Sequence, residues 1–347
     1  MSTQPTLAEI AAVIGVSVMT VSKVLRGEGR ISKTMRERVK AEAARRGYQP
    51  NPHGVGLVRA RKGQGWRGTL ALLVGHKEAN PRTANPPHPL HYHYPRMVAG
   101  VRTRAAELGY GLDVFWVYEP GLSAERLEMI LWTRGIEGLV LLSVQPGEIS
   151  INWTRYACAY LGRPENADGV AFAWADFYSA TRLAYLKTRE AGYRRIGLVI
   201  DTVHDRLTEG RCTGACVATQ LSCKDPRVNP LICPVDALNR SVFSDWMERE
   251  GVDAVLSLRN RTQEWLTVAT RTNSPGVGRA DLDLRTCDGR IAGIWMPYER
   301  IGMAGVDLVN GQLQRNERGL LATTAEIGLL AEWKPGASMP QVADEGN

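Results

Sequence analysis

The sequence lacks the long apolar runs that a membrane protein needs, and its opening residues lack the pattern expected of a secretory leader. No hydrophobic stretch approaches the roughly 18 residues required to span a bilayer. The opening residues, MSTQPTLAEI, have no basic segment ahead of an apolar one, so we expect no secretory signal peptide. We therefore expect a cytoplasmic protein, in which the six cysteines are reduced thiols.

The sequence also lacks the usual catalytic signatures. No G-x-S-x-G, H-E-x-x-H, P-loop or G-x-G-x-x-G pattern occurs in a suitable context. His88, His91 and His93 share a proline-rich loop, where effector contacts or ordinary loop positions fit better than a metal site. We expect a protein that is not an enzyme and that uses no cofactor and no metal.

Positive charge is confined to one end of the chain. The 347 residues are enough for two or three domains. Residues 1–62 hold 12 Lys and Arg against 4 Asp and Glu, whereas residues 63–347 hold 31 against 32. A basic head on a nearly neutral body favours contact with nucleic acid phosphates over general solubility.

Within this basic head, the stretch TLAEIAAVIGVSVMTVSKVLRG predicts two short helices joined by a tight turn. Apolar residues repeat at helical spacing at Leu7, Ile10, Ala11 and Ile14, and then at Val21, Val24 and Leu25. Thr6 is placed to cap the first helix, Gly15 to end it, and Ser17 to cap the second. The pattern fits a helix-turn-helix, although a plain helical hairpin would share it.

A third helix is predicted over ISKTMRERVKAEAARRG, and with it the resemblance to a known family becomes specific. Ser32 is its cap, Met35, Val39 and Ala43 form its apolar face, and most of its arginines and lysines point outward. From Thr6 to Asn51 the chain closely resembles the DNA-binding head of the LacI/GalR family of transcription regulators. Residues 1–50 are thereby predicted to be a helix-turn-helix domain.

The resemblance implies roles for individual head residues. The base-reading positions are Val18, Met19 and Lys23. Lysine can donate to guanine, and apolar side chains can contact a thymine methyl. Positions that contact phosphate are Thr6, Ser17, Thr20, Ser22 and Asn51. An ordinary helix start without a reading role remains the alternative for Val18 and Met19.

Residues 51–65 join the head to the body, and by the resemblance they form a hinge helix when two subunits meet on DNA. Leu57 stands at the position of a leucine that wedges into the minor groove. Gly54 and Gly56 lower the helix propensity of this segment, because each glycine destabilises a helix by about 1 kcal/mol relative to Ala. A flexible linker without a DNA role is the alternative.

From residue 66 to the end, apolar strand-like runs alternate with helical ones. The alternation predicts parallel sheets covered by helices. Similar helix-Gly-Tyr-strand joints at Gly109–Tyr110 and Gly192–Tyr193 suggest two related halves. The body resembles the periplasmic-binding-protein-like body of the same family, in which two doubly wound α/β subdomains hold a small-molecule effector between them and form the dimer. The expected fold is thus an all-α head followed by this α/β body.

By the same resemblance, candidate effector residues can be named. Asp176 and Arg211 stand at family cleft positions, Asp283 is a further cleft candidate, and Trp174 and Trp295 could stack on a sugar ring. His91 lies in the loop that reaches the cleft mouth, and Asn260 stands where many relatives have an aspartate. The sequence departs from the family pattern at Ala215, at Asn260 and in the C-terminal segment. The effector pocket is therefore expected to differ from that of other family members.

The sequence therefore predicts a homodimeric transcription regulator, expected to be a repressor, that binds a near-palindromic operator. Its effector is expected to be a sugar or sugar derivative, and no heptad tail follows the body to favour a tetramer. Control by a protein partner is the first alternative. An enzyme-like sugar-binding protein, such as a hydrolase with an incidental basic head, is the second.

Overall fold

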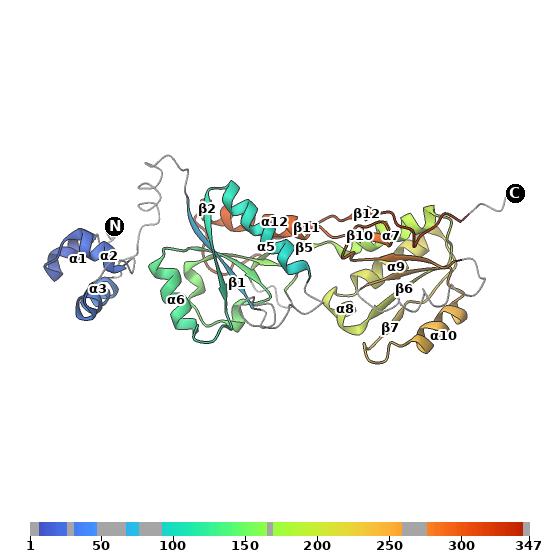
Figure 1. The fold of residues 1–347 in the computed structure, drawn as a ribbon, viewed down its shortest axis with the longest axis horizontal. Helices are drawn as coiled ribbons and strands as arrows, with labels where there is room; N and C mark the ends of the chain where they lie inside the picture. The colour runs from blue at the N-terminus through green and yellow to red at the C-terminus, as the bar shows by residue number, and fades with distance from the viewer. Residues whose placement is uncertain are drawn as a thin grey trace. The chain divides into compact units, whose positions relative to one another are not determined.

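The computed structural model describes residues 7–25, 31–46, 67–75, 92–164, 169–258 and 276–342 (Figure 1). The head contains helices α1 (Leu7–Ile14), α2 (Val18–Leu25) and α3 (Lys33–Arg45). Their core consists of the apolar residues that the sequence placed at helical spacing, and Ile10, Val21 and Val39 are fully buried in it. Ser32 caps α3 by accepting a hydrogen bond from the Met35 amide at 3.4 Å, as predicted.

The chain divides into two compact units, the first of which includes the head, and it passes between them more than once. Unit 1 holds residues up to 88, 97–172 and 302–325, and unit 2 holds 89–96, 173–301 and 326–347.

Among the described residues no single helix is long and apolar enough to cross a membrane. Only α1 and α2 taken together, across their 106° bend, meet those criteria of length and composition.

The first sheet has the strand order β11-β5-β4-β3-β1-β2. Its strands are β1 (Gly68–Val74), β2 (Tyr110–Trp116), β3 (Gly138–Leu142), β4 (Ala157–Leu161), β5 (Ala171–Ala175) and β11 (Glu326–Leu329). The β1–β2, β1–β3 and β3–β4 pairs are parallel. The accompanying helices are α5 (His93–Glu107), α6 (Ala124–Thr133) and α12 (Tyr298–Gln314), with 3₁₀ turns at Pro146–Glu148 and Trp153–Arg155.

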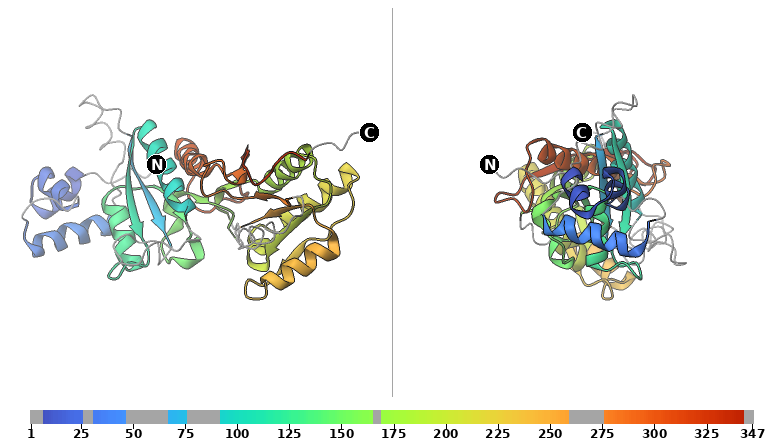
Figure 2. Two further views of the ribbon diagram at one scale, coloured as in Figure 1. Left: turned by 45° about the vertical axis from the view of Figure 1, so that its right-hand side comes forward. Right: turned by 90° about the vertical axis from the view of Figure 1, so that its left-hand side faces the viewer.

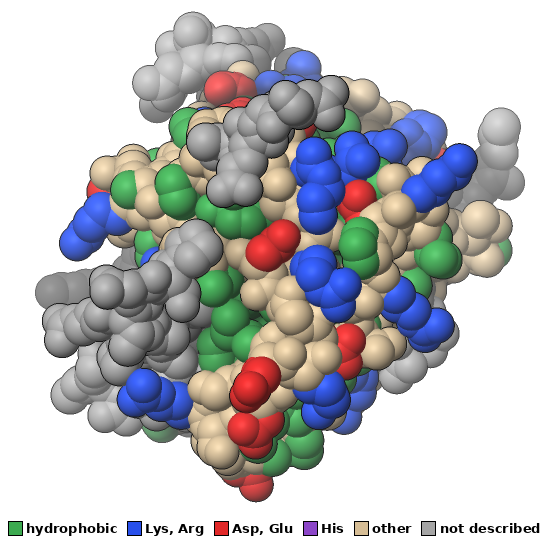
Figure 3. Space-filling model, turned by 90° about the vertical axis from the view of Figure 1, so that its right-hand side faces the viewer, with side chains coloured by type: hydrophobic (Ala, Val, Ile, Leu, Met, Phe, Trp, Pro, Cys, Tyr) green, Lys and Arg blue, Asp and Glu red, His purple; other side chains and the backbone are tan. Residues whose placement is uncertain are grey.

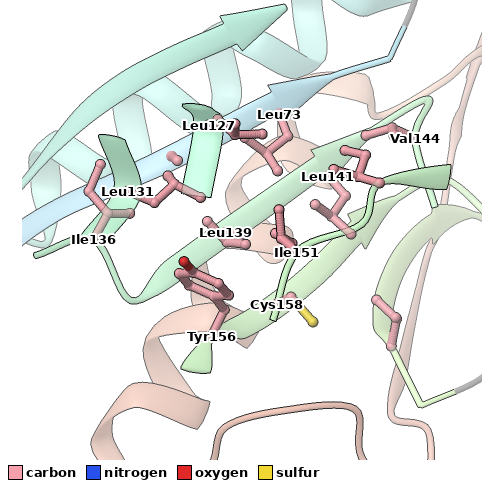
Figure 4. Packing of buried hydrophobic residues seen from close by; sticks show 13 residues of the cluster. Leu73, Leu127, Leu131, Ile136, Leu139, Leu141, Val144, Ile151, Tyr156 and Cys158 are labelled. Carbon is pink, nitrogen blue, oxygen red and sulfur yellow. The ribbon is translucent and has the colours of Figure 1, made fainter. Parts of the chain in front are cut away.

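Both faces of β3 are covered by helices, which explains why its sequence is continuously apolar. Leu139 and Leu141 pack with Leu127 and Leu131 of α6 (Figure 4). Val140, on the opposite face, lies against Gly305 of α12. Successive strand residues point to opposite faces, so a strand buried on both sides has no place for polar side chains.

The second sheet has the order β12-β10-β9-β8-β6-β7. Its strands are β6 (Ile196–Asp201), β7 (Leu231–Cys233), β8 (Ala254–Ser257), β9 (Gly278–Asp281), β10 (Ala292–Trp295) and β12 (Glu332–Lys334). The pairs that join β6 through β10 are parallel, but β12 runs antiparallel to β10. The predicted parallel architecture is therefore confirmed, with one antiparallel edge strand added.

Helices cover both faces of this second sheet. They are α7 (Phe177–Glu190), α8 (Thr202–Leu207), α9 (Arg211–Cys223) and α10 (Arg240–Glu250). Phe243 and Trp246 of α10 pack on Val199 and Val255, while α7 lies on the other side of the sheet (Figure 2). On the face of the molecule drawn in Figure 3, acidic and basic side chains are interspersed, as the near-neutral body composition predicts.

Candidate nucleic-acid interface and ligand-binding residues

The geometry of the head is that of a helix-turn-helix. Helices α1 and α2 meet at 106°, within the range of about 90–120° that is typical of this motif. Gly15 ends α1 with φ +76°, a conformation that residues with a side chain rarely adopt. Its amide, like that of Val16, donates to the Ala11 carbonyl. The tight turn therefore depends on glycine at this position.

The start of α2 is fixed by Ser17. Its hydroxyl oxygen accepts a hydrogen bond from the Thr20 amide at 3.1 Å and lies 2.8 Å from the Thr20 hydroxyl. Burial of Val21 and Val24 fixes the rotation of the helix. Val18 and Met19 are consequently 47% and 66% exposed, and Lys23 is also exposed. The base-reading residues expected from the sequence thus share the outward side of one short helix.

Helix α3 braces this arrangement and carries additional charge. Arg38 donates to the carbonyl of Ile14 at 3.5 Å, at the end of α1. Arg45 and Arg46 both bind Glu42, at 2.7 and 2.5 Å. Hydrogen bonds from Arg45 and Arg46 lower the pKa of Glu42 to about 2. Arg45 and Arg46 are therefore both held by an acidic neighbour, and Lys40 is exposed on the same helix.

Several predicted site residues lie outside the described residues. They are Thr6, Asn51 and Leu57 in the head and hinge, and His91 and Asn260 in the body. The backbone of Ser22 is part of α2.

In unit 2 the structure brings Arg211 and Trp174 together. Arg211 is the first residue of α9, and its guanidinium carbon lies 4.5 Å from the centre of the Trp174 ring. One guanidinium nitrogen is 3.3 Å from Glu209. The Nε atom is buried and has no hydrogen-bond partner in the described part of the chain. A buried donor without an acceptor is costly, so this atom suits an oxygen supplied by a ligand.

Asp283 belongs to a group of aromatic residues in the same unit. Its side chain is 2% exposed and accepts a hydrogen bond from the Tyr298 hydroxyl at 2.5 Å. Tyr92 donates to the Asp283 carbonyl at 3.0 Å. His93 stacks on Tyr298 with 5.0 Å between ring centroids. The position that sequence comparison assigned to the cleft is therefore a buried carboxylate surrounded by aromatic rings.

Trp295 lies under a different arginine. The Arg96 guanidinium is 3.8 Å from the centre of its ring and forms two hydrogen bonds to Glu299, at 2.6 and 2.7 Å. These hydrogen bonds from Arg96 lower the pKa of Glu299. A guanidinium lies against each indole, so Trp174 and Trp295 both support arginines in this structure, and stacking of a sugar ring on either indole stays a prediction.

Asp176 stabilises the start of a helix. It caps α7, accepting from the Ser179 amide at 3.0 Å and from the Ser179 hydroxyl at 2.6 Å. Its side chain is half-buried. A carboxylate has more acceptor capacity than these two bonds use, so the cap leaves it able to accept from a further donor.

All six cysteines are free thiols, as the sequence predicted. Burial raises the pKa of Cys212 to about 11 and that of Cys216 to about 12. Both therefore stay protonated at neutral pH, and a thiol in that form is a poor nucleophile.

Sequence reasoning missed Tyr92, Arg96, Tyr298 and Glu299 as parts of these clusters. Tyr92 and Arg96 belong to the HYHYPR stretch, and Tyr298 and Glu299 begin α12. The density of aromatic and charged residues in the first stretch was a signal. The pairing of the two stretches, such as that of Arg96 with Glu299, could not be predicted. These residues are about 200 positions apart, and local periodicity carries no information on such distant contacts.

Comparisons with known proteins agree with this architecture. Residues 6–51 match the family described as "Bacterial regulatory proteins, lacI family". The transcriptional regulator CelR of Thermobifida fusca is 30% identical over 201 residues, which are 56% of this chain and 55% of that protein. The chain thus matches about half the length of this curated relative.

Solved structures show the same fold over nearly the whole chain. A CelR–cellobiose complex matches with TM-score 0.53 and 20% identity, covering 95% of this chain and 98% of that one. A lac repressor dimer bound to operator and an anti-inducer matches with TM-score 0.54 and 17% identity, covering 97% and 100%. The helix-turn-helix head followed by a periplasmic-binding-protein-like α/β body is therefore the fold of this chain.

Proposed function

We propose that this chain, whose residues 6–51 match the lacI family of bacterial regulatory proteins and which is similar to CelR, is a transcriptional repressor that binds operator DNA through its head. The single observation that carries the proposal is the outward side of α2. Val18, Met19 and Lys23 are exposed there, on a helix whose inner side is packed against α1 and α3. A helix presented in this way fits the major groove of DNA.

We assign one role to each successive segment of the chain. Residues 1–50 read the operator, residues 51–65 form the hinge, with Leu57 inserting into the minor groove, and residues 66–347 bind the effector and a second copy. Ser17 and Thr20, together with Thr6, Ser22 and Asn51, contact phosphates. Two heads in a homodimer read two half-sites, so the operator is near-palindromic. The protein acts in the cytoplasm, where it meets DNA.

Unit 2 supplies effector contacts, and the class of effector that we propose is a carbohydrate. Arg211 offers a buried Nε that has no acceptor among the described residues and that a ligand hydroxyl can satisfy. Asp176 keeps acceptor capacity for hydroxyl hydrogens, and Asp283, Trp174 and Trp295 shape their surroundings. His91 and Asn260 complete the proposed set. Cellobiose bound to a structural relative supports the carbohydrate class.

A direct experiment for the effector is ligand-induced thermal stabilisation with a panel of mono- and disaccharides, nucleosides and amino acids. A sugar that raises the melting temperature, and that loses this effect in Arg211→Lys, supports the proposal. Arg206→Lys is the matched control, because Arg206 is exposed on the neighbouring helix α8. Stabilisation by no member of the panel favours control by a protein partner, the second candidate.

A further inference from the structure

The connection between α8 and α9 contains a residue in a strained conformation, Glu209. Its φ is +53°, in the left-handed region that residues with a Cβ atom rarely adopt. The Glu209 amide donates to the Arg206 carbonyl at 2.9 Å, and the Gly210 amide donates to the Asp205 carbonyl at 2.8 Å. These two bonds form a Schellman motif, in which the left-handed residue is usually glycine. Here a glutamate takes that position, although a glycine follows it directly.

The side chain of Glu209 lies against the guanidinium of Arg211. Arg211 Nη2 donates to Glu209 Oε2 at 3.3 Å, and the guanidinium carbon is 4.5 Å from the centre of the Trp174 ring. The indole is 7% exposed, so it is a fixed surface for the arginine. A long arginine side chain has many rotamers. The carboxylate and the indole together restrict them, because each contacts the guanidinium itself.

The geometry of the connection keeps Glu209 in its left-handed conformation. Residues 208–210 are all that separates α8 from α9, and Gly210 is also left-handed, with φ +66°. The Thr213 hydroxyl of α9 donates to the Asp205 carboxylate of α8 at 2.6 Å, which ties the two helices together. A strained residue persists when its surroundings fix it in this way, and such residues cluster at ligand-binding sites.

We propose that Glu209 is a positioning residue of the effector site. Its carboxylate holds the Arg211 guanidinium on Trp174, so that the buried Nε keeps one orientation before the effector arrives. The inference rests on the proposed function, in which this Nε donates to the effector. A glycine at position 209 would end α8 equally well and without strain, but it would leave Arg211 without this ion pair.

Glu209→Gly tests the proposal, because positioning and stability should change in opposite directions. Relief of the left-handed strain should raise the melting temperature by about 2–4 °C. Affinity for the effector should fall by about 2- to 5-fold, the factor that corresponds to the loss of one exposed ion pair. A residue that served only the fold would lower stability and affinity together when it is replaced.

Lys224→Gly is the matched control. Lys224 is exposed, has φ +56° and ends α9 at the side opposite to Arg211. Its replacement relieves the same kind of strain, so the melting temperature should rise by a similar amount while the affinity stays at the wild-type value. Titration calorimetry with cellobiose and the other sugars of the panel measures the affinities, and circular dichroism confirms that each variant is folded.

The position of Arg211 can also be followed without any ligand, by NMR on protein that contains isotope-labelled arginine. The Nε–H signal of Arg211 is assigned as the one that disappears in Arg211→Lys. Because this Nε is buried, its proton should exchange slowly with water in the wild type. Exchange should become about 10-fold faster in Glu209→Gly and should stay unchanged in Lys224→Gly.

Slow exchange at Arg211 in a folded Glu209→Gly variant would overturn the inference, and so would wild-type affinity of that variant for a sugar that binds the wild type. If no sugar of the panel binds the wild type, the proposed class of effector fails. The exchange of the Nε proton then still decides whether Glu209 positions Arg211, so the two failures are distinguishable.

Discussion

At the scale of single residues, the proposed reading surface is small and mostly apolar. Lys23 is the only cationic side chain on α2, and Val18 and Met19 lie exposed beside it. Direct readout by such a set favours one guanine contact and thymine methyl contacts. Most of the affinity for DNA must then come from phosphate contacts, which do not discriminate between sequences.

Replacing Lys23 by alanine should weaken binding to the operator by about 5- to 150-fold, the cost of about 1–3 kcal/mol for one base contact. Binding to unrelated DNA should change far less. Fluorescence anisotropy with both duplexes at one salt concentration measures the two affinities. Lys40→Ala, a change at an exposed lysine of α3, should reduce both affinities to a similar extent. An equal loss on both duplexes for Lys23→Ala would remove this residue from the base-reading set.

Glu42 restrains two arginines that could otherwise meet phosphates. Because its folded pKa, about 2, lies below its ordinary value, this carboxylate stays ionised at neutral pH. Its stabilising contribution is present above the ordinary value and is lost as the pH falls toward 2. We expect Glu42→Gln to tighten nonspecific DNA binding at neutral pH. The slope of log affinity against log salt should steepen by about 1 to 2, from the extra phosphate contacts.

The matched control for Glu42 is Glu37→Gln, a change at an exposed position of the same helix. It removes the same charge from the head without releasing the Arg45 and Arg46 pair. If both variants steepen the salt dependence equally, the effect is one of net charge, and the restraint on the arginines has no part in DNA binding.

At the scale of elements, turns and caps decide how the head and the body are built. The turn between α1 and α2 places Gly15 in the left-handed region with open space around its Cα. A side chain there meets no neighbour, so a substitution costs only the backbone conformation.

Gly15→Ala should therefore destabilise the head by about 1–2 kcal/mol, the cost of the left-handed region for a residue with a Cβ atom. Hydrogen exchange in α1 and α2 should become about 5- to 30-fold faster. Gly147→Ala is the control, because Gly147 also has open space but no positive φ, and exchange around it should be unchanged. Unchanged exchange in Gly15→Ala would show that the turn tolerates a side chain.

Asp176 combines a helix cap with a proposed ligand contact, and the two roles can be separated. Asp176→Ala should lower the stability of unit 2 by about 0.5–2 kcal/mol, the usual cost of a lost N-cap, and should also weaken effector binding. Asp176→Ser keeps an acceptor for the cap and should restore thermal stability but not effector affinity. If Asp176→Ser restores both, the carboxylate serves only as a cap.

Local patterns predicted much of this fold. The head helices follow from apolar residues at helical spacing, and most strands of the two sheets from short continuous apolar runs. Helices α8, α9 and α10 and the short strands β7, β11 and β12 were not predicted. Helix α9 lacks the charged outer face that reveals an amphipathic helix, and β7 and α8 are too short to show periodicity. The arginines on Trp174 and Trp295 were also missed, because such contacts join distant positions.

At the scale of the whole molecule, the proposed function is a coupling between two ligands. If the effector changes operator affinity by some factor, operator DNA must change effector affinity by the same factor. Couplings of this kind are about 5- to 150-fold. Titration calorimetry of the effector, with and without operator present, should return the same ratio as operator titrations with and without effector. Unequal ratios would mean that the two binding events are not described by one coupled equilibrium.

Sequence-specific recognition of DNA is the central claim, and selection from genomic DNA tests it most directly. Fragments retained by the purified full-length protein are sequenced and compared. The account predicts a shared near-palindromic sequence, and Lys23→Ala should lose its enrichment. Recovery of fragments with no common sequence, by the wild type with and without effector, would contradict the account, because the head would then bind DNA without reading it.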